Sequence, residues 1–273
     1  MKKYTIIIMT FLFVFPLKIM AMQVQDTSKS SVVMDLNSGR ILYQKNSNQQ
    51  RLIASTTKIM TAIIAIENAD INKKVVVGNE VLSMYGTNIY IEVGEKIKII
   101  DLLYGLLLRS GNDASETLAV AVSGSEKKFV ELMNAKAKEI GMSNTIFKNP
   151  HGLDEVTQNY STAADMAILS RYASKNKTYR KIVSTSKKTV STGKKTYLWY
   201  NRNKLLNNYE YCTGGKNGYT PSAGKTLVTT AKKDDLNLTI VTLHDPNEYQ
   251  THQSLYEFIF SKYKAYTIVD KNN

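Results

Sequence analysis

Apolar and polar residues alternate near both ends of the chain, a pattern typical of strands with one buried face. Near the start, Ser31–Asp35 and Arg40–Tyr43 flank a turn in which Gly39 can adopt a positive φ, which predicts a hairpin. Near the end, residues 225–231 and 236–243 alternate in the same way on either side of four charged residues. We expect these last two segments to be neighbouring strands.

The middle of the chain carries the helical period instead. The stretch Asp101–Leu108 is apolar nearly all round, which favours a buried helix, and strand character returns only after Tyr179. Between residues 75 and 100 we expect loops and short strands. Further helices are expected near Ser55, from a cap at Asn112 or Asp113 to Val122, over 125–140, over 161–175 and over 252–263. The sequence therefore predicts an α/β (α+β) protein, with an antiparallel sheet formed from both chain ends, flanking helices and a central all-helical lobe.

The first 21 residues have the pattern of a secretory signal peptide. An uncharged, largely apolar run over residues 4–17 follows two lysines, and Ala21 is a small residue suited to cleavage. As a helix the run is only about 20 Å long, against a hydrocarbon core of about 30 Å. An uncleaved anchor is the alternative, because apolar residues continue beyond Lys18. Either way we expect an exported protein, secreted or N-terminally anchored, with residues 22–273 as a single domain and no β-rich domain after it.

The composition is basic, with 36 Lys and Arg against 23 Asp and Glu and a formal net charge of +13. The basic residues are dispersed and no nucleic-acid motif accompanies them, so we expect contact with anionic envelope polymers or lipid head groups, or simply a soluble surface, and no nucleic acid. The single cysteine, Cys212, cannot form an intramolecular disulfide and is expected at a buried strand end. No metal-ligand spacing, phosphate loop or dinucleotide fingerprint is present, so no metal and no cofactor is expected.

The strongest candidate for chemistry is the pair Ser55 and Lys58, one helical turn apart at the start of an apolar helix. A serine hydroxyl is a poor nucleophile until a base removes its proton, and a lysine at i+3 lies on the same helix face. The three histidines show no pairing with a serine. The same Ser-x-x-Lys pattern begins at six other serines, which are Ser125, Ser174, Ser184, Ser191, Ser222 and Ser261. Only Ser55 has an apolar stripe around it, from Leu52 to Ile66, that could exclude water and lower the pKa of the lysine.

Three motifs in order complete the pattern: Ser55–Lys58, Ser110–Asn112 and Lys216–Gly218. They resemble the Ser-x-x-Lys, Ser-x-Asn and Lys-Thr-Gly triple of penicillin-binding proteins and serine β-lactamases. The resemblance is closest to the D-alanyl-D-alanine carboxypeptidases, the low-molecular-weight penicillin-binding proteins, whose middle motif is Ser-Gly-Asn-Asp-Ala and which carry a stretch like Asn149–Asp154. It extends over residues 31–263 and implies a β-lactamase/transpeptidase-like fold, with residues 22–273 as one D,D-peptidase catalytic domain.

The resemblance also implies roles for the catalytic residues. Ser55 would attack the carbonyl carbon between two D-alanines, and Lys58 would take its proton. Because a lysine in water has a pKa near 10.4, burial and a second cation, expected to be Lys216, would have to lower that value. Ser110 would relay a proton to the departing D-alanine, and Asn112 would hold Lys58 and the substrate amide.

The substrate-binding residues follow from the third motif. Lys216 would bind the terminal carboxylate of the substrate, and the backbone N–H groups of Ser55 and Tyr219 would form the oxyanion hole. Gly218 would permit close approach of the backbone. Asn217 stands where the family usually has a threonine, whose hydroxyl donates to the carboxylate, so substrate geometry and β-lactam affinity depend on how the longer amide fits.

These features predict a serine D-Ala-D-Ala carboxypeptidase that removes the terminal D-alanine from peptidoglycan pentapeptides through an acyl-enzyme on Ser55. Its partners would be a stem peptide ending in D-Ala-D-Ala and β-lactam inhibitors, with membrane contact through the N-terminus only. A D,D-transpeptidase or endopeptidase, and an inactive peptidoglycan-binding homologue favoured by Asn217, remain open. A β-lactamase would need a further glutamate, and the helical period explains the candidate Glu131 better. His151, in a Pro-His-Gly turn, is interpreted as structural.

Overall fold

The computed structural model describes residues 24–265. The predicted signal segment, residues 1–21, lies outside the described residues. Within residues 24–265, no helix combines the length and the apolar character needed to cross a membrane.

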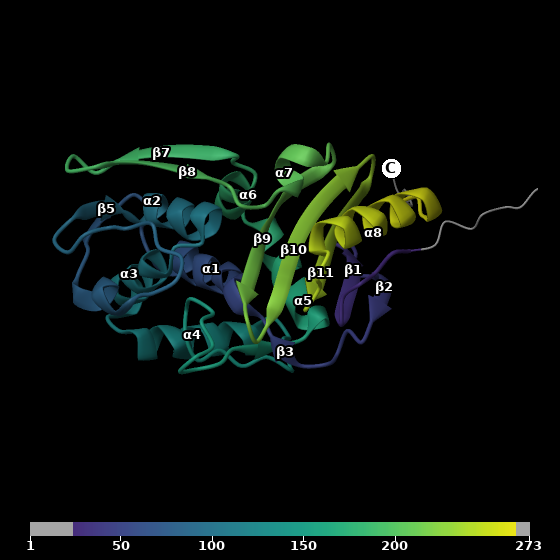
Figure 1. Cartoon of the computed structure of the whole chain (residues 1–273), viewed down its shortest axis with the longest axis horizontal. Helices are drawn as coiled ribbons and strands as arrows, with labels where there is room; N and C mark the ends of the chain where they lie inside the picture. Colours follow the sequence, from purple (N-terminus) through teal and green to yellow (C-terminus); the bar gives the residue numbers. More distant parts are fainter. Residues whose placement is uncertain (1–23, 266–273) are drawn as a thin grey trace, which may run out of the picture.

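A five-stranded antiparallel sheet joins the two ends of the chain, as predicted (Figure 1). Its strand order is β2-β1-β11-β10-β9, so the N-terminal hairpin pairs with the C-terminal strands through the β1–β11 ladder, from Ser30 opposite Leu243 to Asp35 opposite Leu238. The turn between the first two strands contains Gly39 with φ +80°, as its position predicts. The strands are β1 (Ser30–Asp35), β2 (Ile41–Lys45), β9 (Cys212–Thr220), β10 (Gly224–Lys233) and β11 (Leu236–Leu243).

Alternation along these strands produces two apolar layers, one on each face of the sheet. Val33 packs with Tyr256 of the last helix, α8 (Glu248–Lys262), on one face. Its neighbour Val32 belongs to the larger cluster on the other face, which includes α5 (Ala163–Lys175). Figure 1 shows α8 in front of the sheet and α5 behind it. The sheet is therefore buried on both faces.

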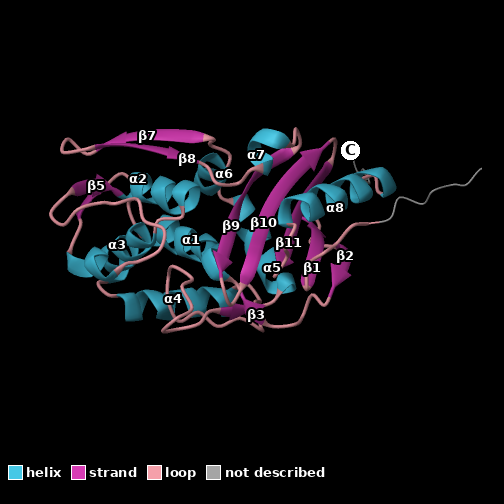
Figure 2. Ribbon diagram, viewed as in Figure 1, coloured by secondary structure: helices cyan, strands magenta, loops and turns pink. Residues whose placement is uncertain are grey.

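The predicted helical lobe lies beside the edge strand β9 (Figure 2). Helix α1 runs through its centre with eight buried residues, and the remaining helices pack around it. Its elements are α1 (Lys58–Asn68), α2 (Ile99–Tyr104), the π-helical turn η3 (Gly105–Arg109), α3 (Asn112–Ser123), α4 (Glu126–Glu139) and α6 (Lys177–Val183). The shorter elements are β3 (Arg51–Leu52), η1 (Ala54–Thr57), β4 (Lys74–Val76), η2 (Asn79–Ser83), β5 (Lys96–Lys98), β6 (Tyr160–Ser161), β7 (Lys187–Ser191), β8 (Thr196–Tyr200) and α7 (Leu205–Asn208).

Three boundaries differ from the sequence prediction. Helix α6 occupies part of the region where strand character was expected, because the Asn176 side chain caps it and Tyr179, Ile182 and Val183 form one buried face. The cap of α3 is Gly111, whereas Asn112 or Asp113 was predicted. The Asp113 carboxylate instead accepts hydrogen bonds from the backbone of residues 89–91. Helix α8 begins at Glu248, four residues earlier than expected.

Candidate active site

Ser55 lies in the 3₁₀ turn η1, which leads directly into the buried helix α1. The Lys58 side chain begins the helix and folds back along it, so that its Nζ lies 3.1 Å from Ser55 Oγ. Lys58 is 0% exposed, whereas Ser55 is half-buried. The spacing in the sequence thus does bring the amine to the hydroxyl.

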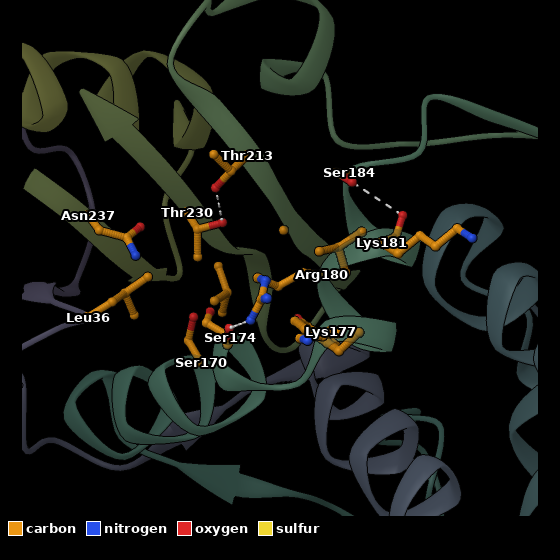
Figure 3. A pocket seen from close by; sticks show the side chains of 14 residues that line it. Leu36, Ser170, Ser174, Lys177, Arg180, Lys181, Ser184, Thr213, Thr230 and Asn237 are labelled. Carbon is orange, nitrogen blue, oxygen red and sulfur yellow. Dashed lines mark hydrogen bonds between the residues drawn. The ribbon is translucent and has the colours of Figure 1, made fainter. Parts of the chain in front are cut away.

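The other Ser-x-x-Lys segments do not form such a pair. Among the hydrogen bonds of residues 24–265, only that between Ser55 and Lys58 joins a serine side chain to the lysine side chain three positions later. Figure 3 shows two of the alternatives, Ser174 and Ser184, lining a cavity of about 370 Å³ between α5–α6 and the sheet. There the Ser184 hydroxyl donates to the Lys181 carbonyl at 3.2 Å.

The Lys58 amine has two further partners, both of them carbonyl oxygens. It donates to Asn112 Oδ1 at 2.7 Å and to the backbone oxygen of His151 at 2.6 Å. Burial lowers the pKa of Lys58 from 10.5 to about 7, against the opposing charges of Asp113 and Glu116. At neutral pH a large fraction of this lysine is therefore an uncharged amine.

Arg202 is the neighbouring cation that lowers the pKa of Lys58 further, and the sequence did not indicate it. Lys216 is only 1% exposed, and burial, followed by the charges of Lys58 and Arg202, lowers its own pKa well below 10.5. Burial thus disfavours the charged form of Lys216 as well. Arg202 is exposed, and its charge acts on both buried lysines.

The second motif, Ser110 to Asn112, forms the turn between η3 and α3. Ser110 is buried and adopts a left-handed backbone, φ +71°, which reverses the chain so that Asn112 begins α3 and faces Lys58. The Asn112 amide nitrogen donates to the Tyr85 carbonyl at 2.7 Å. One N–H of that amide remains for a substrate, since an amide NH₂ has two.

The third motif lies on β9, the edge strand, alongside η1. A Cβ at Gly218 would lie 2.8 Å from the Ser55 backbone nitrogen and 2.6 Å from Thr226 Oγ1, so only glycine allows this approach. Lys216 Nζ donates to the Asn217 backbone oxygen at 2.5 Å, and the side chain of Tyr219 is largely exposed. The strand thus forms one wall beside the serine.

Residues 18–247 match the profile of peptidase family S11, described as D-alanyl-D-alanine carboxypeptidase. The chain belongs to this family. Among curated relatives, the D-alanyl-D-alanine carboxypeptidase DacF of Bacillus subtilis is 37% identical over 254 residues, which cover 90% of this chain and 65% of that protein. DacA of Haemophilus influenzae is 34% identical over 76% of this chain and 54% of its own length. The chain therefore spans between about half and two thirds of these two relatives.

Solved structures give the same family and fold. A D-alanyl-D-alanine carboxypeptidase from Mycobacterium tuberculosis superposes with a TM-score of 0.83 at 30% identity, covering 87% of this chain and 92% of that one. A mutant of the Streptomyces K15 DD-transpeptidase superposes with a TM-score of 0.81 at 28% identity, covering 88% and 100%. The predicted fold class and the predicted family are thus confirmed.

The segment Asn149–Asp154 contacts Lys58 in the structure, a contact that the sequence did not predict. The Asn149 side chain accepts from the backbone N–H groups of His151, at 3.2 Å, and Gly152, at 2.6 Å, and so holds a tight turn. The turn presents the His151 carbonyl to Lys58 and is tied to α1 by a bond from the Thr61 hydroxyl to the Pro150 oxygen. Backbone acceptors leave no signature in residue types, which is why only the Asn-Pro-His-Gly pattern could have indicated it.

Replacing Gly152 by alanine should destabilise this S11 domain by about 3 kcal/mol. Gly152 has φ +87°, and a Cβ there would lie 2.0 Å from the Ala54 oxygen, directly before the serine. The control is Gly141→Ala, because Gly141 has φ +88° but no atom within 4 Å of the added carbon, and should cost about 1 kcal/mol. Urea unfolding of both variants measures the difference. Equal losses at the two sites would show that the contact with Ala54 does not matter.

Proposed function

We propose that this chain is a serine D-Ala-D-Ala carboxypeptidase that removes the terminal D-alanine from peptidoglycan pentapeptides and is acylated by β-lactams. The observation that carries this function is the set of three partners around the Lys58 amine. A neutral amine has two N–H groups and one lone pair. The two N–H groups match Asn112 Oδ1 and the His151 carbonyl, which leaves the lone pair for the Ser55 hydroxyl.

In the acylation step, Ser55 Oγ attacks the carbonyl carbon between the two D-alanines while its proton passes to Lys58 Nζ. The carbonyl oxygen gains the negative charge, which the backbone N–H groups of Ser55 and Tyr219 would stabilise. The carbon–nitrogen bond then breaks, and the leaving amine receives the proton from Lys58 through the Ser110 hydroxyl. D-alanine departs and the shortened peptide stays bound to Ser55 as an ester.

In the deacylation step, a water molecule attacks the ester carbonyl and gives its proton to Lys58. The proton returns to Ser55 Oγ as the ester bond breaks, and the peptide leaves with a new carboxylate. Atoms balance over the cycle, since one water is consumed and one peptide bond is lost. The same ester taken up by an amine instead of water gives transpeptidation.

The substrate carboxylate would lie against β9, near Lys216 and Asn217. A bound carboxylate favours the charged form of Lys216 and so opposes the effect of burial on this amine. The exposed Arg202 keeps this side of the site positive in the free enzyme. We further infer that the enzyme acts in the extracytoplasmic cell-wall space, secreted or held by its N-terminal segment.

Two assays on the purified protein test the proposed function. A fluorescent penicillin should label the chain covalently, and D-alanine should be released from a pentapeptide ending in D-Ala-D-Ala. Absence of both would leave the inactive peptidoglycan-binding alternative. Release that is unaffected by an added amine, without a cross-linked product, supports hydrolysis, whereas a cross-linked product supports the D,D-transpeptidase alternative that the K15 relative represents.

Replacing Asn217 by threonine should raise kcat/KM for the pentapeptide about fivefold, the effect of about 1 kcal/mol from one better hydrogen bond. Asn217 is half-buried on β9, and its Oδ1 lies 3.4 Å from Lys216 Nζ, so the amide competes with the carboxylate for that amine. A threonine hydroxyl in its place can donate to the carboxylate. Asn237→Thr, at the start of β11 and away from Ser55, is the matched control (Figure 3). An unchanged or lower kcat/KM would mean that Asn217 does not weaken the reaction with the pentapeptide.

A further inference from the structure

Glu116 is a buried carboxyl group that the reaction above does not use. It lies one turn after Asn112 on α3, is 4% exposed, and its Oε1 has no hydrogen-bond partner. Nε2 of His151 lies 3.6 Å from this oxygen. Burial raises the pKa of Glu116 from 4.5 to about 8, helped by the charges of Glu126 and Glu80 and opposed by that of Lys58.

The protonation of His151 follows from its other ring nitrogen. The Leu153 backbone N–H donates to His151 Nδ1 at 3.0 Å, so this nitrogen carries a lone pair. Burial, with the nearby charge of Lys58, lowers the pKa of the ring to about 3, so the ring is neutral and its one proton is on Nε2, facing Glu116. The backbone oxygen of the same residue accepts from Lys58 Nζ at 2.6 Å. His151 therefore connects Glu116 to the amine.

A buried carboxylate can be neutralised by a bound divalent cation as well as by a proton. One ligand atom from each of Glu116, Glu126 and His151 lies within 4.8 Å of the others. A histidine that binds a metal through Nε2 normally donates its Nδ1–H to a partner, whereas here Nδ1 accepts. The ring thus presents a proton and not a lone pair to the two carboxyl groups. This favours a proton over a metal ion between them.

We propose that Glu116 is a positioning residue for Lys58. It faces the Nε2–H of His151, and the carbonyl of His151 holds the Lys58 amine. The proton on Glu116 sets the pH range in which the Lys58 amine is uncharged. The proposal rests on the proposed function, in which Lys58 is the base. When Glu116 loses its proton, its negative charge favours the ammonium form of Lys58 and opposes the loss of that lysine's proton. Besides Glu116, the charged groups that act on Lys58 are Asp113 and Arg202, and these are unchanged by the event.

The test is the pH dependence of acylation by a fluorescent penicillin in the wild type and in Glu116→Gln, which keeps the shape but cannot ionise. For the wild type the rate should rise with pH around the pKa of Lys58, about 7. In Glu116→Gln the midpoint should fall by about half a pH unit, a rate gain of about threefold just below it. Glu131→Gln makes the same change on the exposed side of α4 and should leave the curve unchanged.

Stability provides a second readout that does not depend on activity. Because the pKa of Glu116 is higher in the folded state than the unfolded value of 4.5, the folded chain binds more protons between pH 4.5 and 8. The free energy of unfolding of the wild type should therefore fall, relative to Glu116→Gln, as the pH rises through this window. Urea unfolding at both ends of the window measures it and also shows that the variant is folded.

The experiment distinguishes a failure of the proposed function from a failure of the proposed role of Glu116. Failure of the wild type to become acylated at any pH would remove both the proposed function and the role of Glu116. Acylation with the same pH curve in the wild type and Glu116→Gln would overturn the role of Glu116 alone. A change in acylation or melting temperature on adding Zn²⁺ or EDTA, lost in Glu116→Gln, would replace the proton by a metal ion and would also overturn it.

Discussion

Ser55→Ala should abolish covalent labelling by penicillin and slow D-alanine release by at least about 10⁴-fold, because the acyl-enzyme cannot form without the hydroxyl. The change removes one half-buried oxygen at the mouth of the site, so the free energy of unfolding should stay within about 0.5 kcal/mol of the wild type. Labelling is read on a denaturing gel and D-alanine by a coupled assay.

Ser174→Ala is the matched control for this loss. Ser174 begins another Ser-x-x-Lys segment, and it lines the cavity between α5–α6 and the sheet (Figure 3). Its replacement should leave both assays unchanged. Labelling that survives in Ser55→Ala and disappears in Ser174→Ala would mean that Ser174, and not Ser55, is the nucleophile.

Lys58→Met should lower the acylation rate by about 10³-fold, the usual contribution of a general base. Methionine fills the same buried channel in α1 but offers no lone pair to Ser55, and it leaves the oxygens of Asn112 and His151 without their donor. Stopped-flow acylation by penicillin measures the effect, and Lys177→Met, at the N-terminus of α6, serves as the control. A loss of less than about tenfold would point to another base.

The same variant tests the protonation of Lys58 in the folded state. Since burial lowers the pKa of Lys58 from 10.5 to about 7, the unfolded chain binds the extra proton between these two values. The stability of the wild type relative to Lys58→Met should therefore rise with pH from about 7 to 10.5. A constant difference across this range would mean that the buried lysine keeps its charge.

Much of the architecture could be predicted because its elements have a clear period. The alternation in β10 and β11, the turn at Gly39 and the helix over residues 125–140 depend only on neighbouring residues, and all three are present. Helix α6 could not be predicted, since its threonine, isoleucine and valine favour strands. Burial of Tyr179 against the lobe outweighs that local preference.

In the candidate site, too, the sequence predicts the local contacts but not the contacts between distant residues. The contact between Ser55 and Lys58 is local, so the spacing alone predicts it. The cation Arg202, the carbonyl of His151 and the buried carboxyl of Glu116 all come from residues at least 61 positions away from Ser55. Only the fold brings them to the amine, and no motif in the sequence distinguishes Arg202 or Glu116 from other charged residues.

The pairing of β1 with β11 has a consequence for synthesis on the ribosome. Ser30 lies opposite Leu243 and Asp35 opposite Leu238, so this ladder joins segments more than 200 residues apart. At about 20 residues per second, the second strand emerges about 10 s after the first. The wall that carries Gly218 is attached to β1 only through β10 and β11. A nascent chain therefore lacks the wall beside Ser55 until nearly the whole domain has been translated.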